Sequence, residues 1–186
     1  MVVMAASVRR IVGETTFAML VSATVSILAG LFLQVEVERF LTFPFLLSLI
    51  PPINDMGGNI GSMLGARLSS ALHLGLIRPR IERQRALDEN VAGSIGSGLF
   101  SFFAAGVVLL VWGMVKGIVG PLRFFLTFIM AGAILTPIIV VCTIFITVIS
   151  YVKRLDPDNV VGPLITSIAD VLGVLVLLLV SKLLWG

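Results

Sequence analysis

Long apolar runs separated by short charged segments make up most of this chain. A helix needs about 20 mostly apolar residues to cross the roughly 30 Å hydrocarbon core of a bilayer. Runs of at least that length occur at five places, and we expect five transmembrane helices over residues 15–34, 43–76, 93–115, 124–151 and 160–184. The pattern predicts an all-α integral membrane protein in which residues 1–186 form a single transmembrane domain surrounded by the lipid bilayer.

The second of these segments differs from the others in length and composition. As one straight helix, residues 43–76 would extend about 50 Å, which exceeds the thickness of the bilayer with its headgroups. The segment contains Pro51, Pro52 and several glycines, among them Gly57, Gly61 and Gly65, whose spacing favours close helix packing. We expect this Pro/Gly-interrupted helix to be bent or partly unwound in its middle, either for packing alone or to expose carbonyl groups to an ion.

The scarcity of charge excludes several classes of protein. Hydrophobic residues make up 58% of the chain and charged residues only 12%, whereas soluble domains carry about 25% charged residues. A water-soluble protein with so little polar cover would expose large apolar patches and aggregate. A soluble enzyme, a nucleic-acid-binding protein and a disordered chain are therefore excluded. The single cysteine, Cys142, excludes a disulfide within one chain and a thiolate metal cluster.

The basic residues between the spans predict an orientation. If the N-terminus is cytoplasmic, eight basic residues face the cytoplasm, namely Arg9, Arg10, Arg78, Arg80, Arg83, Arg85, Lys153 and Arg154. Four face the other side, namely Arg39, Lys116, Arg123 and Lys182. Positive charge prefers the cytoplasmic side, so we expect a multi-pass protein of the cell membrane with the N-terminus in the cytoplasm and the C-terminus outside. The first apolar stretch is long and lacks a following small-residue cleavage site, which favours a retained helix over a signal peptide.

Two carboxylates lie inside apolar spans, Asp55 in the second and Asp170 near the centre of the fifth. An aspartate at the bilayer centre costs roughly 2.5–3.5 kcal/mol even on insertion scales, so it is a functional hypothesis by default. Asn59 follows Asp55 by one helical turn, and Gly58 beside it is a candidate for lining a pathway. These oxygen ligands suit hard cations such as Mg²⁺, Ca²⁺ and Mn²⁺. The alternative is structural, with Asp170 paired to Arg67 or the carboxylates capped by serine and threonine.

Two sequence motifs resemble those of a known family. Residues 52–62 (PINDMGGNIGS) resemble a motif of the MgtE magnesium transporters, and residues 65–75 (GARLSSALHLG) are closer to their eukaryotic relatives, the solute-carrier magnesium transporters. Residues 155–173 (LDPDNVVGPLITSIADVLG) resemble the motif that opens the last helix of the family. The resemblance implies an MgtE-type five-helix transmembrane domain that transports Mg²⁺.

The resemblance also implies roles for individual residues. Asp170 would face the pore and hold hydrated Mg²⁺, with Asn59 beside it and the backbone carbonyls of Thr166 and Gly173 nearby. Asp55, like its neighbour Asn54, stands where we expect small or apolar residues, and this additional carboxylate could change selectivity or permit proton coupling. The predicted metal site therefore consists of Asp170, Asn59, Asp55, Thr166, Gly173 and Gly58, and Mg²⁺ is the only ion or cofactor expected. The loop acids Asp156 and Asp158 would either concentrate cations or cap the last helix.

Bacterial members of the family form dimers with a cation path near the subunit interface, whereas the eukaryotic relatives carry two such units in one chain. This sequence contains one unit, so we expect a homodimer, or a heterodimer with a related half. The segment before the first span is short, and we expect the regulatory domains of the bacterial members to be absent or supplied by another chain. The sequence leaves open whether transport is channel-like or exchange.

Two other functions stay open. The chain could be a structural or accessory subunit of a larger transporter, in which case Asp170 would have no role in transport. It could also be a metal-dependent lipid phosphotransferase, because residues 55–67 superficially resemble the acid-rich motif of those enzymes. Such enzymes need several acids on neighbouring helical turns, and residues 56–81 contain none. We therefore expect that the protein is not an enzyme.

Overall fold

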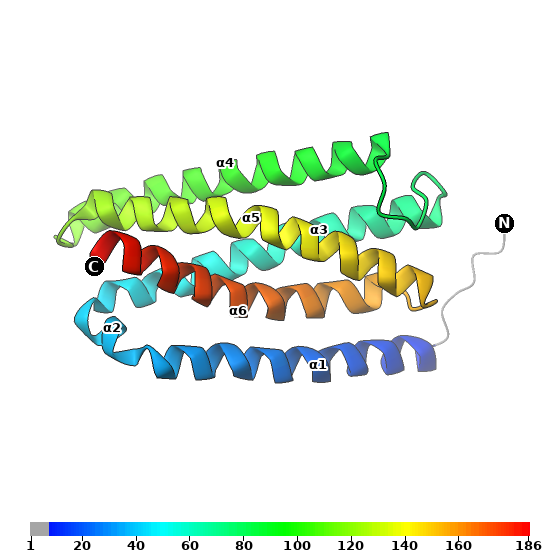
Figure 1. The fold of residues 1–186 in the computed structure, drawn as a ribbon, viewed down its shortest axis with the longest axis horizontal. Coiled ribbons are helices and arrows are strands. Elements are labelled where there is room, and N and C mark those ends of the chain that lie inside the picture. Colours follow the sequence, from blue (N-terminus) through cyan, green and yellow to red (C-terminus); the bar gives the residue numbers. More distant parts are fainter. Residues whose placement is uncertain (1–7) are drawn as a thin grey trace.

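The computed structural model describes residues 8–186, and in this range the chain consists of helices joined by short connections. Five long helices lie side by side (Figure 1). In chain order the helices are α1 Val8–Val35, α2 Val37–Thr42, a 3₁₀ helix Pro44–Leu49, α3 Ile50–His73, α4 Arg85–Val115, α5 Pro121–Val152 and α6 Pro157–Trp185. The predicted all-α class is confirmed for this range. The first seven residues of the predicted domain lie outside it.

Four helices of the described range are long and apolar enough to cross a membrane, namely α1, α4, α5 and α6. They contain the predicted spans 15–34, 93–115, 124–151 and 160–184, and each extends beyond its span because polar end residues continue the helix. The remaining predicted span, residues 43–76, contains α3, which is not among the four. Its asparagines, serines, glycines and aspartate make it less apolar than the others.

The predicted unwinding in the middle of the second segment is wrong. This segment opens with the 3₁₀ helix, and α3 then continues without interruption from Ile50 to His73. Pro51 and Pro52 lie in the first turn of α3, where a missing N–H costs no intrahelical hydrogen bond. The prolines therefore begin the helix instead of bending it, and the glycines that follow lie in regular helix.

Glycines on α3 allow α6 to approach closely. A Cβ atom at Gly61 would lie 2.5 Å from Ile165 Cγ1 and 3.0 Å from Ile139 Cγ2. A Cβ atom at Gly65 would lie 2.5 Å from Val161 Cγ1. Small residues at helix contacts in membranes allow backbones to come together, so the packing role predicted for these glycines is confirmed.

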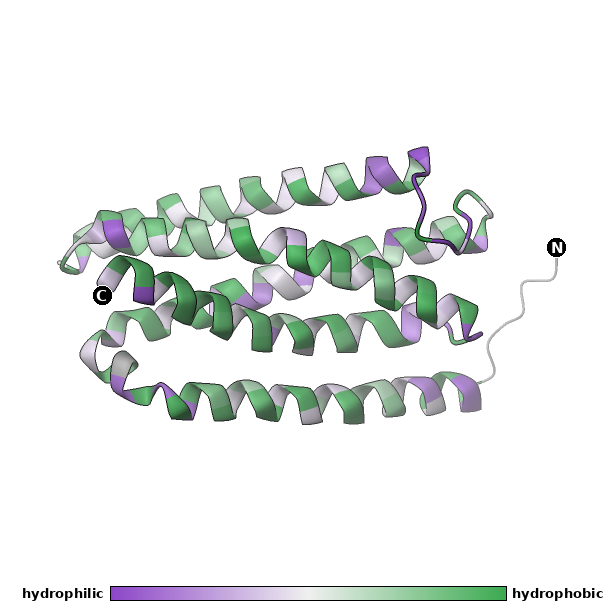
Figure 2. Cartoon of the chain, viewed as in Figure 1, coloured by the Kyte–Doolittle hydropathy of each residue, from purple (hydrophilic) through white to green (hydrophobic). Residues whose placement is uncertain are grey.

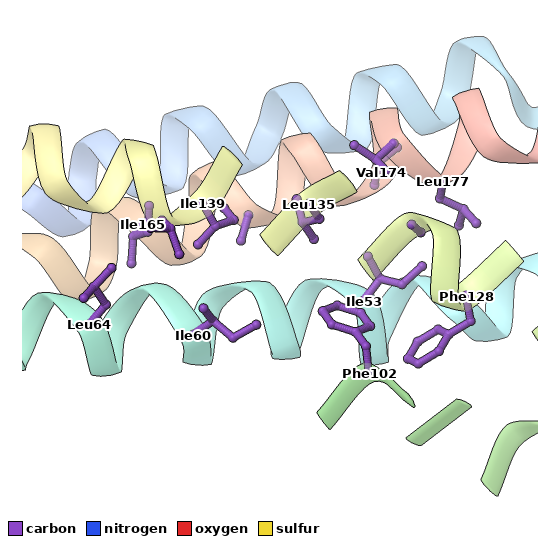
Figure 3. Close-up of a cluster of buried hydrophobic side chains, with 14 of the residues drawn as sticks. Ile53, Ile60, Leu64, Phe102, Phe128, Leu135, Ile139, Ile165, Val174 and Leu177 are labelled. Atoms are coloured by element: carbon purple, nitrogen blue, oxygen red, sulfur yellow. The ribbon is translucent and has the colours of Figure 1, made fainter. Parts of the chain in front are cut away.

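Helices α3, α5 and α6 enclose the apolar core (Figure 3). Fully buried side chains from all three helices meet there, namely Ile53, Leu64, Leu135, Ile139, Ile165 and Leu177. Helix α4 joins this core through Phe102, whose ring packs on Phe128 with a centroid distance of 5.3 Å. A side chain at Gly132 of α5 would overlap the same Phe102 ring.

Helices α1 and α6 run in the same direction, as their contacts show. Near the start of both helices, Arg10 Nη2 donates a 2.6 Å hydrogen bond to the carbonyl of Arg154. Near their other ends, Lys182 Nζ donates to Glu36 Oε1 at 2.8 Å. The start of α1 and the C-terminus therefore lie at opposite ends of the bundle (Figure 1).

The charged residues gather at the two ends of the bundle, while the helix middles are mainly hydrophobic (Figure 2). One end combines the start of α1 with the α3–α4 and α5–α6 connections. It holds the eight basic residues that the sequence places in the cytoplasm, and the other end holds the set of four. The fold thus places the larger group of basic residues at one end of the bundle and the smaller group at the other end.

Replacing Gly61 by alanine is expected to loosen the contact between α3 and α6. The new Cβ would crowd Ile165 and Ile139, and overpacking of this kind costs about 1–3 kcal/mol. Gly96→Ala is the matched control, because no atom lies within 4 Å of a Cβ at that position of α4. Thermal unfolding of the purified protein in detergent should give a lower midpoint for Gly61→Ala only. Equal midpoints for both variants would contradict the close contact.

Candidate cation site

Asp170 lies near the middle of α6, between side chains of α1 and α3. Ser26 Oγ of α1 donates a 3.4 Å hydrogen bond to Asp170 Oδ2. The polar side chain of Asn54 on α3 also lies close enough to interact with the carboxylate. Asp170 itself is only partly buried. Its carboxylate thus has neutral polar neighbours from two helices and keeps an open side.

The structural alternative of an ion pair between Asp170 and Arg67 is not observed. The ion pairs between described side chains lie at the ends of helices and in the α3–α4 connection: Arg10–Glu14, Arg83–Asp88, Arg85–Glu89 and Lys182–Glu36. Arg67 is exposed. The other structural alternative, capping by serine or threonine, is represented by the single long bond from Ser26. In the described part of the chain, Asp170 therefore has no cationic partner.

Asp55 and Asn59 lie on the outer side of α3. Asn59 Nδ2 donates to Asp55 Oδ2 at 3.0 Å, as their spacing of one helical turn predicts. Both side chains are exposed. Thr166 of α6 is also exposed, and its side chain lies 3.4 Å from where a Cβ of Gly58 would be. The polar residues of α3 and α6 that are far apart in sequence therefore meet on one side of the bundle.

The contacts of α3 with α6 fix the relative depth of these residues. The two helices are antiparallel, as shown by the pairs Asn54–Gly173, Gly57–Ala169, Gly61–Ile165 and Gly65–Val161. Asp170 lies between the α6 partners of Asn54 and Gly57, so Asp55 lies at about the same depth. The two intramembrane carboxylates are thus level along the bundle, with Asp55 exposed and Asp170 partly buried toward α1.

We refer to Asp55, Asn59, Thr166 and Asp170 together as the polar face. Elsewhere the exposed residues along the middles of the helices are mainly apolar, for example Phe100, Val108 and Val141 with 72%, 68% and 51% of their surface accessible. Apolar side chains can face lipid, whereas a carboxylate at membrane depth needs protein, water or an ion beside it. Lipid alone is therefore an unfavourable environment for the polar face.

Gly58 and Gly173 are buried and act through close approach. Gly58 lies against Thr166, and a Cβ at Gly173 would overlap Asn54 Oδ1. Asn54 Oδ1 is itself buried and has no hydrogen-bond partner. Gly173 thus leaves the space that the Asn54 amide occupies beside Asp170.

The loop acids at the start of α6 differ from each other in their contacts. The Asp156 side chain accepts a 3.1 Å hydrogen bond from the backbone N–H of Asp158 and caps α6. Glu14 of α1 accepts from the backbone N–H of Asp156 at 3.1 Å and from Asn159 Nδ2 at 3.0 Å. For Asp156 the structure supports the capping alternative, while Asp158 is exposed in the first turn.

The polar face consists of four of the predicted site residues, and no sequence pattern predicted its contact with α1. Asp55, Asn59, Thr166 and Asp170 were all predicted site residues, and the fold brings them to one side. Ser26 was not predicted. The available signal was weak: Ser22 and Ser26 are one turn apart in an otherwise apolar helix, and in the structure Ser22 Oγ donates to the Pro163 carbonyl at 2.9 Å.

The donors on and beside the polar face are all oxygen or amide groups. Within residues 8–186, no three histidine, cysteine, aspartate or glutamate side chains come together as a metal cluster. One protomer therefore offers few carboxylates to a cation at any point. Mg²⁺ suits such a sparse set, because it keeps several waters and uses one or two carboxylates. The arrangement can hold a hydrated hard cation through hydrogen bonds to its waters.

Comparison with known protein families gives an independent assignment. Residues 50–180 match the model of the MgtE family, which is described as a divalent cation transporter. The match begins at the first residue of α3 and includes the whole polar face and well over half of the chain. No solved structure matches the chain significantly. The family match confirms the resemblance seen in the motifs, and with the apolar helices it supports a multi-pass membrane protein. The chain belongs to the MgtE family of divalent cation transporters.

Proposed function

We propose that this protein moves Mg²⁺ across the membrane along the polar face, with Asp170 as the main cation-holding residue. The observation that carries the proposal is the exposure of Asp55 and Asn59 beside Thr166 and Asp170, in a bundle whose other helices face outward with apolar residues. A carboxylate without a cationic partner is costly at membrane depth. A hydrated divalent cation supplies that partner, and membership of a divalent cation transporter family supports this reading.

In this proposal α3 crosses the membrane as the fifth spanning helix. Its 24 residues extend about 36 Å at 1.5 Å per residue, enough for the hydrocarbon core. Its buried side packs on α5 and α6 through Ile53, Leu64 and the glycines. Its polar side carries Asp55 and Asn59. With α5 and α6 on one side and the proposed cation path on the other, α3 does not need the uniform apolar composition of the other four helices.

A second copy of the chain, or a related half, is proposed to cover the polar face. A two-fold arrangement places the same surface of both protomers in contact, so two Asp170 side chains would flank one path. Mg²⁺ would stay hydrated between them, with Asn59 and the backbone oxygens of Thr166 and Gly173 hydrogen-bonding its waters. Contacts through water keep binding weak enough for release to the other side.

The end of the bundle with eight basic residues is proposed to be cytoplasmic. In a Cys142→Ala background, single cysteines at Ile81 and Val119 would report the two ends without changing any charge. Both side chains are exposed, and they lie in the α3–α4 and α4–α5 connections. A membrane-impermeant maleimide added to intact cells should label the Val119→Cys variant and not the Ile81→Cys variant. The reverse pattern would invert the proposed orientation.

Asp170→Asn is expected to slow Mg²⁺ uptake into proteoliposomes by roughly tenfold or more, since the charge that attracts the cation is lost. Asp88→Asn is the control, because Asp88 is an exposed acid in the first turn of α4, and its carboxylate lies 3.9 Å from Arg83 Nε. This control should keep wild-type uptake. Repeating the assay with Ca²⁺, and with an imposed Na⁺ or H⁺ gradient, reports selectivity and distinguishes a channel from an exchanger.

Other outcomes of the same assay favour the other functions. Equal uptake by wild type and Asp170→Asn would remove Asp170 from the path and direct attention to Asp55. No uptake by either protein would favour an accessory subunit that requires another chain. Metal-stimulated turnover of lipid substrates would favour a phosphotransferase, a reading that the transporter family match does not support.

Cross-linking tests whether two copies meet at the polar face. Met63 lies one turn beyond Asn59 on α3 and is 52% exposed, and its replacement leaves the proposed cation ligands intact. In the Cys142→Ala background, Met63→Cys is expected to form a disulfide-linked dimer in native membranes under mild oxidation. Val108→Cys on α4, which is 68% exposed, is the control and should stay monomeric. Cross-linking through Val108 alone would place the interface on α4 instead.

A further inference from the structure

We infer that Ser26 and Asn54 are positioning residues, which hold the Asp170 carboxylate in the orientation that captures the cation. The inference rests on the proposed function of Asp170. It assigns a role to α1, which lies outside the segment matched by the family model. It also gives a role to an amide whose oxygen is left without a partner.

Ser26 approaches Asp170 from a helix that packs chiefly on α6. Helix α1 buries few side chains, among them Ala18 and Ala29, so its position depends on its contacts with α6. Two of these come from serines one turn apart. Ser22 Oγ donates to the Pro163 carbonyl at 2.9 Å, and Ser26 Oγ donates to Asp170 Oδ2 at 3.4 Å. The Ser22 bond therefore only attaches α1 to α6, whereas the Ser26 bond reaches the Asp170 carboxylate.

Asn54 approaches Asp170 from α3. Its side chain interacts with the Asp170 carboxylate, while its Oδ1 atom is buried without a partner. A buried acceptor without a partner lowers stability, and an apolar side chain of the same shape would avoid that cost. Gly173 lacks the Cβ that would overlap Oδ1. The interaction with the Asp170 carboxylate accounts for the presence of an amide at this position.

The hydrogen bond from Ser26 and the neighbouring amide of Asn54 together restrict the rotation of the Asp170 side chain. A carboxylate that is already oriented loses less conformational freedom when it binds a cation. Removing either polar group should therefore weaken the capture of Mg²⁺ and leave the rate at saturating Mg²⁺ nearly unchanged. The KM for Mg²⁺ and the maximal rate distinguish these two effects.

The first test measures Mg²⁺ uptake into proteoliposomes across a range of Mg²⁺ concentrations. Ser26→Ala should raise KM about three- to tenfold, as expected for the loss of one typical hydrogen bond, with a maximal rate close to wild type. Ser26→Thr keeps the hydroxyl and should restore KM. Ser22→Ala removes the neighbouring α1–α6 hydrogen bond without touching Asp170, and should leave KM unchanged. Equal changes in Ser22→Ala and Ser26→Ala, or no change in either, would overturn the inference.

The second test uses Asn54→Leu, which removes the amide and keeps a side chain of similar shape. The expected result is a higher KM for Mg²⁺ together with an unfolding midpoint in detergent that is unchanged or higher, because the unpartnered oxygen is gone. A residue that only supports the fold would behave differently. A lower midpoint with an unchanged KM would overturn the role of Asn54.

Asp170→Asn in the same uptake assay distinguishes this inference from the proposed function on which it rests. If Asp170→Asn transports like wild type, the cation-holding role of Asp170 fails, and the positioning role fails with it. If Asp170→Asn is inactive while Ser26→Ala and Asn54→Leu keep the wild-type KM, only the positioning role fails.

Discussion

The close approach of α3 and α6 is the contact on which the candidate site depends. Gly61 and Gly65 bring the two backbones together where any side chain would collide with Ile165 or Val161. This contact sets the register that puts Asp55 level with Asp170 and Gly58 beside Thr166. It also leaves α3 with its apolar side in the core and its polar side outward. A wider spacing between the helices would separate the polar groups of α3 from the carboxylate of α6.

Much of the fold follows from the sequence because the apolar runs are long. The four apolar helices lie where these runs predict them, and Asp55 and Asp170 stand out because carboxylates are rare at membrane depth. The error in the second segment has a local cause. In a sequence, two prolines such as Pro51 and Pro52 are compatible with the end of one helical segment or with the start of another. Only the preceding 3₁₀ helix shows that they begin α3.

The contacts of Asp170 could not be predicted in the same way. Ser26 reaches it because α1 packs alongside α6 in this register, a pairing of distant helices that no local pattern encodes. The partner of Asn54 depends on the antiparallel register of α3 and α6. The alternative pair with Arg67 had the correct charges, yet Arg67 lies about three turns along α3 from the level of Asp170. The depth of each residue along the bundle therefore determines which side chains can contact Asp170.

The two intramembrane carboxylates differ in exposure and in contacts, and we propose that they have different roles in transport. Asp55 is exposed and already accepts a hydrogen bond from Asn59, a residue of its own helix. Asp170 is partly buried, accepts a hydrogen bond from Ser26 of α1 and interacts with Asn54 of α3. In the proposed dimer, two Asp170 side chains would match the double charge of one Mg²⁺, and a fixed carboxylate is the better site of capture. Asp55, more exposed and held only within α3, is better placed to attract the hydrated ion than to hold it.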